Sequence, residues 1–263
     1  MDMQLRGKVA LVTASSKGLG KATAFALARE GANVAICSRN EAAIQATAQE
    51  IRAATGVDVV AVQADVTKPD NITRFVTSAA EHFGRIDILV TNAGGPQSGS
   101  FDMFSDADWL AAVNLTLMSA VRLIRASLPY LRKAGSGRIV NILSVSTKQP
   151  IEGLLFSNSI RPAVAGLAKT LSFELAKDNI LVHNVCPGTH DTDRIRELDA
   201  ARAAREGRAV ADVASDSLKS IPLGRRGKPE ELAALVVFLC SAQAAFMTGT
   251  TIQVDGGAYR GIM

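Results

Sequence analysis

Residues 9–20 read VALVTASSKGLG, an apolar run that ends in a turn with two glycines. A short β-branched run that leads through such a turn into a helical pattern is typical of a strand followed by a helix. Glycines let the backbone approach a pyrophosphate there, and the free N–H groups of the helix N-terminus favour negative charge. The stretch predicts a parallel α/β fold with a dinucleotide site, although an ordinary turn with two packing glycines fits the same residues.

A P-loop is a rival interpretation of this turn, because Gly20 and Lys21 resemble the end of the pattern G-x-x-x-x-G-K-S/T. The pattern requires glycine and a hydroxyl residue where this chain has Ser15 and Ala22. We therefore exclude a P-loop.

Strand-like and helix-like stretches alternate along most of the chain. Glycines close the helical patterns at 19–30, 41–54 and 71–83, as expected for helix C-termini. Such alternation implies parallel strands joined by right-handed crossovers, with helices on both faces of one sheet. We predict a single doubly wound α/β Rossmann domain over residues 1–263, whose seven mostly parallel strands lie at 9–13, 33–37, 57–62, 86–90, 138–143, 180–185 and 250–254.

Residues 188–228 interrupt the alternation, since they lack strand signals and carry two polar helical pieces. A long irregular stretch of this kind is often functional, and we expect a substrate lid. Its segment 194–208 has five arginines against three acids, and further cations follow at 225, 226 and 228. These charges would attract an anionic acyl carrier or a coenzyme A ester, but solvated helix faces explain them equally well.

The composition limits the classes of function. The 263 residues are 48% hydrophobic and only 5% aromatic, with a net charge of +4, which suits a soluble globular protein and disfavours nucleic-acid binding. The longest unbroken apolar run, 232–240, has nine residues, fewer than the roughly 20 that cross a bilayer. Residues 1–12 lack the order of a signal peptide. We predict a cytoplasmic protein without a membrane or nucleic-acid partner.

The cysteines Cys37, Cys186 and Cys240 have no C-x-x-C spacing, so neither a disulfide framework nor a zinc site is favoured. We expect buried thiols and no metal. His82 and His183 lie in a predicted helix end and strand and look structural.

Two basic residues flank the expected dinucleotide site. After the second strand, where an NAD-binding fold places an acid for the ribose hydroxyls, the chain has Ser38 and Arg39. An arginine there suits a 2′-phosphate, and Lys17 in the glycine turn adds positive charge. We predict that NADP(H) is preferred over NAD(H), the alternative being two solvated surface cations.

Over essentially its whole length the chain resembles the short-chain dehydrogenase/reductase family, especially its 3-oxoacyl-acyl-carrier-protein reductase-like members. The resemblance implies an oxidoreductase that interconverts a carbonyl and a secondary alcohol, with 3-oxoacyl compounds as a candidate class, in a homotetramer or homodimer. Asp255–Gly256–Gly257 resembles the family's last-strand ending. The implied cofactor contacts are Thr13, Ser15, Ser16, Lys17, Gly18, Leu19, Gly20, Ser38, Arg39, Asp65, Val66, Asn92, Ala93, Gly94, Arg161, Pro187, Gly188 and Thr192. The implied catalytic positions are Asn114, Ser144, Ser157 and Arg161.

The chain departs from the family pattern at two places. Ala14 stands where the family has glycine, and its Cβ restricts φ and crowds a close ligand. The Tyr-x-x-x-Lys motif, expected thirteen residues after Ser144, is replaced by Ser157 and Arg161. Neither Tyr130 nor Tyr259 has a lysine four residues later. Pro162 suits the first turn of a helix, so we expect this helix to start later than in the family.

These departures leave two functions open. An aliphatic hydroxyl needs an adjacent base, and arginine stays protonated, but general acid–base help contributes only about 10²- to 10⁴-fold in rate. The first hypothesis is a weakened enzyme whose proton donor is one of Ser144, Lys148, Ser157, Ser159, His190 and Asp191, although a solvated loop position is the simpler expectation for His190. The second is a non-catalytic nucleotide-binding protein with a sensing or assembly role.

Overall fold

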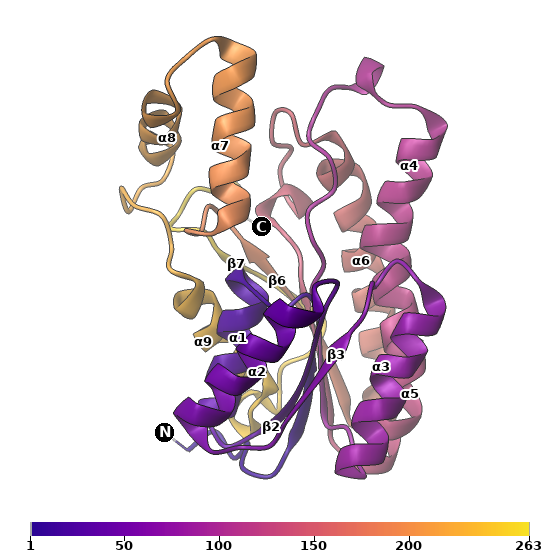
Figure 1. Ribbon diagram of the computed structural model, residues 1–263. Helices are drawn as coiled ribbons and strands as arrows, with labels where there is room; N and C mark the ends of the chain where they lie inside the picture. The colour runs from indigo at the N-terminus through magenta and orange to yellow at the C-terminus, as the bar shows by residue number, and fades with distance from the viewer. Residues whose placement is uncertain (1, 263) are drawn as a thin grey trace.

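Seven parallel strands form one twisted sheet with helices on both faces (Figure 1). The computed structural model describes residues 2–262. The strand order is β3-β2-β1-β4-β5-β6-β7, and every neighbouring pair is parallel. The predicted doubly wound α/β fold is confirmed, with strands β1 Val9–Val12, β2 Asn33–Ser38, β3 Val59–Gln63, β4 Ile88–Thr91, β5 Gly137–Ile142, β6 Ile180–Pro187 and β7 Thr250–Val254.

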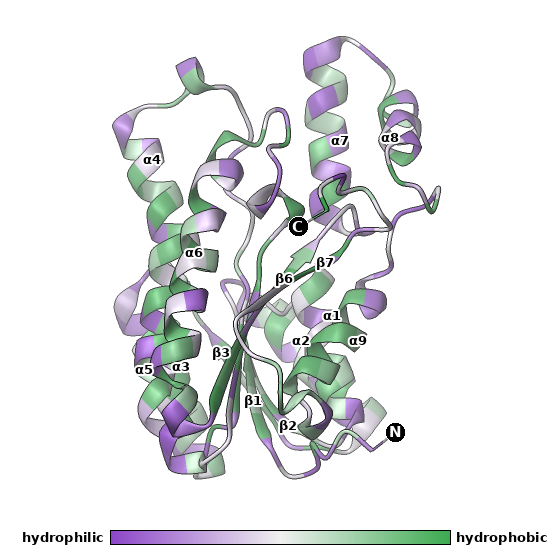
Figure 2. Cartoon of the chain, turned by 180° about the vertical axis from the view of Figure 1, so that it is seen from behind, coloured by the Kyte–Doolittle hydropathy of each residue, from purple (hydrophilic) through white to green (hydrophobic). Residues whose placement is uncertain are grey.

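Helices α1, α2 and α9 cover one face of the sheet, and α3, α5 and α6 cover the other (Figures 1 and 2). A one-turn π-helix, η2 (Asn114–Met118), joins α4 to α5. The three predicted helix ends, at 30, 54 and 83, agree with the structure to within one residue. The helices are α1 Gly18–Arg29, α2 Glu41–Thr55, α3 Pro69–Phe83, α4 Asp106–Val113, α5 Ser119–Ala134, α6 Leu155–Glu174, α7 Asp193–Glu206, α8 Val210–Lys219 and α9 Pro229–Cys240.

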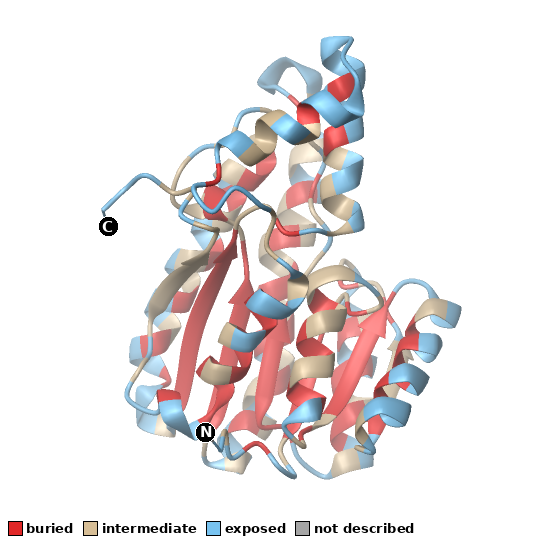
Figure 3. Cartoon of the chain, turned by 90° about the vertical axis from the view of Figure 1, so that its left-hand side faces the viewer, coloured by how far each residue is buried: buried red, intermediate tan, exposed pale blue. Residues whose placement is uncertain are grey.

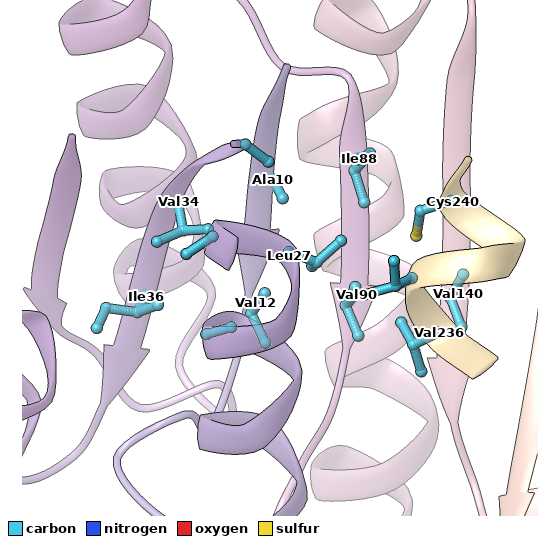
Figure 4. Packing of buried hydrophobic residues seen from close by; sticks show 14 of the residues in the cluster. Ala10, Val12, Leu27, Val34, Ile36, Ile88, Val90, Val140, Val236 and Cys240 are labelled. Carbon is cyan, nitrogen blue, oxygen red and sulfur yellow. The ribbon is translucent and has the colours of Figure 1, made fainter. Parts of the chain in front are cut away.

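Alternation along β1 explains why the sheet has a core on each face. Ala10 and Val12 belong to the cluster beneath α1 and α9, where Leu27 and Val236 pack onto the strands (Figure 4). Val9 and Leu11 belong to the cluster beneath α3 and α5. Because successive side chains of a strand point to opposite faces, a strand buried on both sides is a continuous apolar run.

Helix α6 begins at Leu155 and includes Pro162. Pro162 is thus the eighth residue of the helix, so the expectation of a late-starting helix with the proline in its first turn was wrong. A proline inside a helix removes one backbone hydrogen bond, but α6 buries Phe156, Ile160 and Val164 against neighbouring elements. Packing of this apolar face stabilises the helix across the proline.

The lid expected at 188–228 contains two helices, α7 and α8, as predicted. They stand beyond the carboxyl ends of the strands, and their outer surface is largely exposed (Figures 1 and 3). Below them lies the point where the chain order reverses, between β1 and β4. In open α/β sheets ligands bind in the crevice at such a switch point.

The continuous helical segment Asp106–Ala134 is long and apolar enough to cross a membrane by length and composition alone. The sequence prediction of no membrane span counted unbroken apolar runs and did not anticipate this segment. In the fold, Leu123, Ile124 and Leu131 of the segment are buried in the core beside α3. The apolar window of the segment is 28% buried, so these residues pack in the core while most of the window is not covered by the rest of the chain.

Candidate active site

A cavity of about 1220 Å³ opens at the carboxyl edge of the sheet. It extends from the turn between β1 and α1 to the floor formed by β5 and α6, with α7 as an upper wall. Thr13, Ser15, Gly20 and Asn114 do not line it. It brings together the remaining predicted site residues, namely Ser16, Lys17, Gly18, Leu19, Ser38, Arg39, Asp65, Val66, Asn92, Ala93, Gly94, Ser144, Ser157, Arg161, Pro187, Gly188 and Thr192.

Thr13 and Ser15 hold the turn in place from beneath. Thr13 Oγ1 donates to the Asn92 carbonyl oxygen at 2.6 Å and accepts from the Asn92 backbone N–H at 2.9 Å. Ser15 Oγ donates to the Val12 carbonyl oxygen at 2.9 Å. These bonds tie the ends of β1 and β4 together, so both residues shape the cavity without facing it.

In the turn, Ala14 and Gly18 have positive φ, whereas Gly20 is restricted by close packing. Ala14 has φ 49°, the left-handed region that costs a residue with a Cβ about 1–2 kcal/mol. Gly20 packs directly under this turn, because a Cβ there would collide with the Ala14 carbonyl oxygen and lie 2.8 Å from Asn92 Nδ2. Only glycine therefore fits at position 20.

The two cations predicted for the cofactor site have different surroundings. Lys17 Nζ lies 3.4 Å from Asp193 and 3.8 Å from Glu197, both on α7. Arg39 is exposed at the end of β2, and among residues 2–262 its guanidinium has no hydrogen-bond or ion-pair partner. Of these two residues, Arg39 is therefore the one whose charge is available to bind an anion.

Three hydroxyls and one guanidinium meet on the cavity floor. Arg161 Nε donates to Ser157 Oγ at 2.9 Å, and Ser157 Oγ lies 3.2 Å from Ser146 Oγ. The Ser146 backbone N–H donates to Ser144 Oγ at 3.1 Å. Ser146 lies in the helical turn after β5 and was not predicted, since nothing in its spacing distinguishes it from other serines of the chain.

Arg161 is fixed in place by its backbone contacts. Its Nη1 donates to the Leu143 carbonyl oxygen at 2.7 Å and to that of Ile142 at 3.4 Å. Burial lowers the pKa of Arg161 to about 10, the neighbouring Cys186 opposes this shift, and the charge of Arg194 adds to it. The guanidinium is still protonated at neutral pH.

The Asn114 side chain forms hydrogen bonds with other residues of the protein. Its Nδ2 donates to the Thr67 carbonyl oxygen at 3.1 Å, and its Oδ1 accepts from Arg122 Nη1 at 2.5 Å. The backbone carbonyl of Asn114 accepts from Ser119 N–H in the π-helical turn. Turns of this kind are frequent at functional sites, but the amide itself does not line the cavity.

His190 is buried, with 2% of its surface exposed, so the expectation of a solvated loop histidine was wrong. Its Nδ1 lies 3.3 Å from the Gly188 carbonyl oxygen, and its ring packs on Gly227 so closely that a Cβ there would lie 2.8 Å from the ring. Burial lowers the pKa of His190, while the Gly188 contact opposes the shift. Close packing under the lid, which the sequence pattern did not reveal, excludes water.

The other proton-donor candidates are less well placed. Ser159 donates to the Leu155 carbonyl oxygen on an exposed part of α6, and Asp191 pairs with Arg196 at 2.6 Å. Lys148 Nζ lies 5.5 Å from the centre of the Tyr259 ring. Of the six candidates, Ser144, Ser157 and His190 line the cavity.

The cysteine expectation is confirmed: Cys37, Cys186 and Cys240 are free and buried. Burial raises the pKa of Cys37 and of Cys240 to about 12, so neither is a reactive thiolate. Within the described part of the chain, no three His, Cys, Asp or Glu side chains lie close enough to hold a metal.

The sheet order, the glycine turn and the crevice are those of a Rossmann-like α/β fold. The family is identified by comparison with known sequences. The model of the family described as enoyl-(acyl carrier protein) reductase matches residues 13–259. The chain is 35% identical to the 3-oxoacyl-acyl-carrier-protein reductase FabG of Thermotoga maritima, over 97% of this chain and 99% of that protein. It is also 35% identical to the short-chain reductase protein NovJ of Streptomyces niveus, over 95% and 93% of the two chains. The chain belongs to the short-chain dehydrogenase/reductase family.

Solved structures agree with this assignment. L-sorbose reductase from Gluconobacter frateurii, complexed with NADPH and L-sorbose, superposes with a TM-score of 0.95 over 100% of both chains at 33% identity. The chain therefore shares both the complete fold and a third of its sequence with a reductase of this family.

Proposed function

We propose that this protein is an NADP(H)-dependent oxidoreductase that interconverts a carbonyl and a secondary alcohol through an altered active site. One observation carries the proposal: the same cavity is lined by the glycine turn and by Ser144, Ser157 and Arg161. The likeness to a reductase complexed with NADPH supports the choice of cofactor. The likeness to 3-oxoacyl reductases supports 3-oxoacyl compounds as a substrate class.

The cavity fits a phosphorylated dinucleotide. The space in front of Gly94 is open, since an added Cβ would meet nothing within 4 Å. The unpaired guanidinium of Arg39 suits a 2′-phosphate, which NAD lacks, because arginine binds phosphate through charge-assisted hydrogen bonds. Lys17 would add positive charge only by sharing its contacts with Asp193 and Glu197. Arg39 is therefore the main support for NADP(H) over NAD(H).

The chemistry that a bound nicotinamide supplies is hydride transfer. Ser144 Oγ accepts from Ser146 N–H, which leaves the Ser144 hydroxyl hydrogen for a substrate oxygen. Arg161 orients Ser157 by donating to its Oγ, but Arg161 stays cationic and relays no proton. These residues position a carbonyl, and the proton comes from a hydroxyl or from water, a weaker arrangement than a tyrosine acid.

A non-catalytic nucleotide-binding protein is the second candidate, and one observation favours it. Among residues 2–262 no tyrosine lines the cavity. The two functions are separated by titrating NADPH fluorescence and then following NADPH oxidation with 3-oxoacyl esters, quinones and simple ketones. Binding followed by turnover supports the enzyme, binding without turnover supports the second candidate, and no binding contradicts both.

The remaining predictions concern the domain boundaries, the location in the cell and the oligomeric state. We keep a single domain over 1–263 with 188–228 as its lid, because α7 forms a wall of the cavity. A cytoplasmic location without nucleic-acid or membrane partners also stays a prediction. For the expected homodimer or homotetramer, Leu110 is 70% exposed on the long apolar helix and offers a surface for a second copy. Light scattering on the purified protein tests this assembly.

A further inference from the structure

The cavity floor contains a cation without an acidic partner. Arg161 uses Nε for Ser157 Oγ and Nη1 for two backbone carbonyl oxygens. No described residue accepts a hydrogen bond from its Nη2, and no described carboxylate lies within ion-pair distance of it. Arg161 is half-buried in the cavity wall, where its charge loses part of its contact with water, and an anion bound there would compensate that loss.

The acids that line the same cavity are all engaged elsewhere. Asp65 accepts from Thr67, and Asp199 pairs with Arg226. Asp193 and Glu197 pair with Lys17, and they also contact Arg196 and Arg194, respectively. None of these four carboxylates lies within ion-pair distance of Arg161, so its free Nη2 is available to an anion from outside the chain.

A second guanidinium faces the same space from the lid. Arg194 lies in the first turn of α7, lines the cavity, and donates to the Pro96 carbonyl oxygen at 2.8 Å. Its charge adds to the lowering of the Arg161 pKa, which means that the two cations repel each other. Arg194 shares its ion-pair partner Glu197, at 3.7 Å, with Lys17. An anion between the two arginines would relieve that repulsion.

Apolar side chains surround this charged end of the cavity. Ile151 and Leu154 precede α6, and Ile195 and Leu198 lie on α7. The combination of guanidinium groups with apolar walls suits a carboxylate joined to a hydrocarbon body, since Arg binds carboxylates through parallel hydrogen bonds.

We propose that the substrate of this site carries a free carboxylate on an apolar body, held by Arg161 with help from Arg194. This proposal rests on the proposed oxidoreductase function and specifies its substrate class as oxo acids or hydroxy acids. Arg161 is then a specificity-determining residue, which a lysine replaces in part and a neutral side chain does not replace.

The test compares hexanoate with hexanamide, which has the same body without the charge. Calorimetry on the full chain, with and without saturating NADPH, measures both affinities. We expect hexanoate to bind more tightly by about tenfold or more and not to compete with NADPH. Arg161→Gln abolishes the difference, Arg161→Lys keeps part of it, and Arg194→Gln reduces it. Arg29→Gln, at an exposed arginine that does not line the cavity, leaves it unchanged.

Equal binding of the two probes to the unmodified protein overturns the proposal without recourse to any variant. Hexanoate that competes with NADPH also overturns it, because Arg161 would then serve the cofactor. If NADPH binds and hexanoate does not, the substrate class fails while the proposed function stands. If hexanoate binds and NADPH does not, the proposed function fails and the anion site stands.

Discussion

Arg161 Nε donates to Ser157 Oγ at 2.9 Å, one helical turn apart on α6. These residues stand where the family resemblance places a tyrosine and a lysine. Because Ser157 is a weak acid and Arg161 a permanent cation, the pair binds and orients rather than moving a proton.

Restoring the family pair should raise activity. We expect the double substitution Ser157→Tyr and Arg161→Lys to increase NADPH-dependent ketone reduction by about tenfold or more, within the range of general acid–base help. Steady-state rates measure the effect, with Ser157→Tyr alone as control. An unchanged rate in a folded double variant would mean that the pocket differs in more than these two side chains.

Arg39 should set the choice between the two cofactors. Arg39→Gln should weaken NADPH binding by about tenfold or more, as expected for loss of a charged hydrogen bond, and leave NADH binding unchanged. Fluorescence titration measures both. Arg29→Gln, another exposed arginine, which does not line the cavity, is the matched control. Equal loss for both cofactors would count against a 2′-phosphate contact.

The backbone strain at Ala14, in the glycine turn, can be removed by substitution. Ala14→Gly should stabilise the fold by up to about 1 kcal/mol, because glycine adopts positive φ without penalty. Gly20→Ala should destabilise it, because its Cβ would collide with the Ala14 carbonyl oxygen. Denaturant unfolding checks both changes, and a less stable Ala14→Gly variant would contradict the assigned strain.

Acid should destabilise the protein through His183. Burial lowers the pKa of His183 from 6.5 to about 4, and the charge of Arg138 adds to the shift. Below pH 6.5 the His183 imidazole is protonated in the unfolded chain but stays neutral in the folded chain. The free energy of unfolding therefore falls by about 2 kcal/mol between pH 6.5 and 5. His183→Gln should flatten this slope. An unaltered slope would show that other groups cause the acid sensitivity.

The sequence predicted those features that follow from local pattern. The β-branched run before Gly18 and Gly20 indicated the first strand and turn, and spacing from Ser144 located Ser157 and Arg161. It did not predict contacts between distant elements. Asn114 and Arg122 donate to the Thr67 carbonyl oxygen because their helical segment packs beside the loop after β3, and His190 is buried where its ring packs on Gly227. Such contacts depend on tertiary packing, which periodicity does not encode.

The central claim is that the turn from Thr13 to Gly20, together with Arg39, binds a phosphorylated dinucleotide. Titration calorimetry of the unmodified protein with NADPH and NADH tests it most directly. We expect saturable binding of one nucleotide per chain, with a higher affinity for NADPH than for NADH. Absence of heat with either nucleotide, confirmed by an unshifted melting temperature, would contradict it.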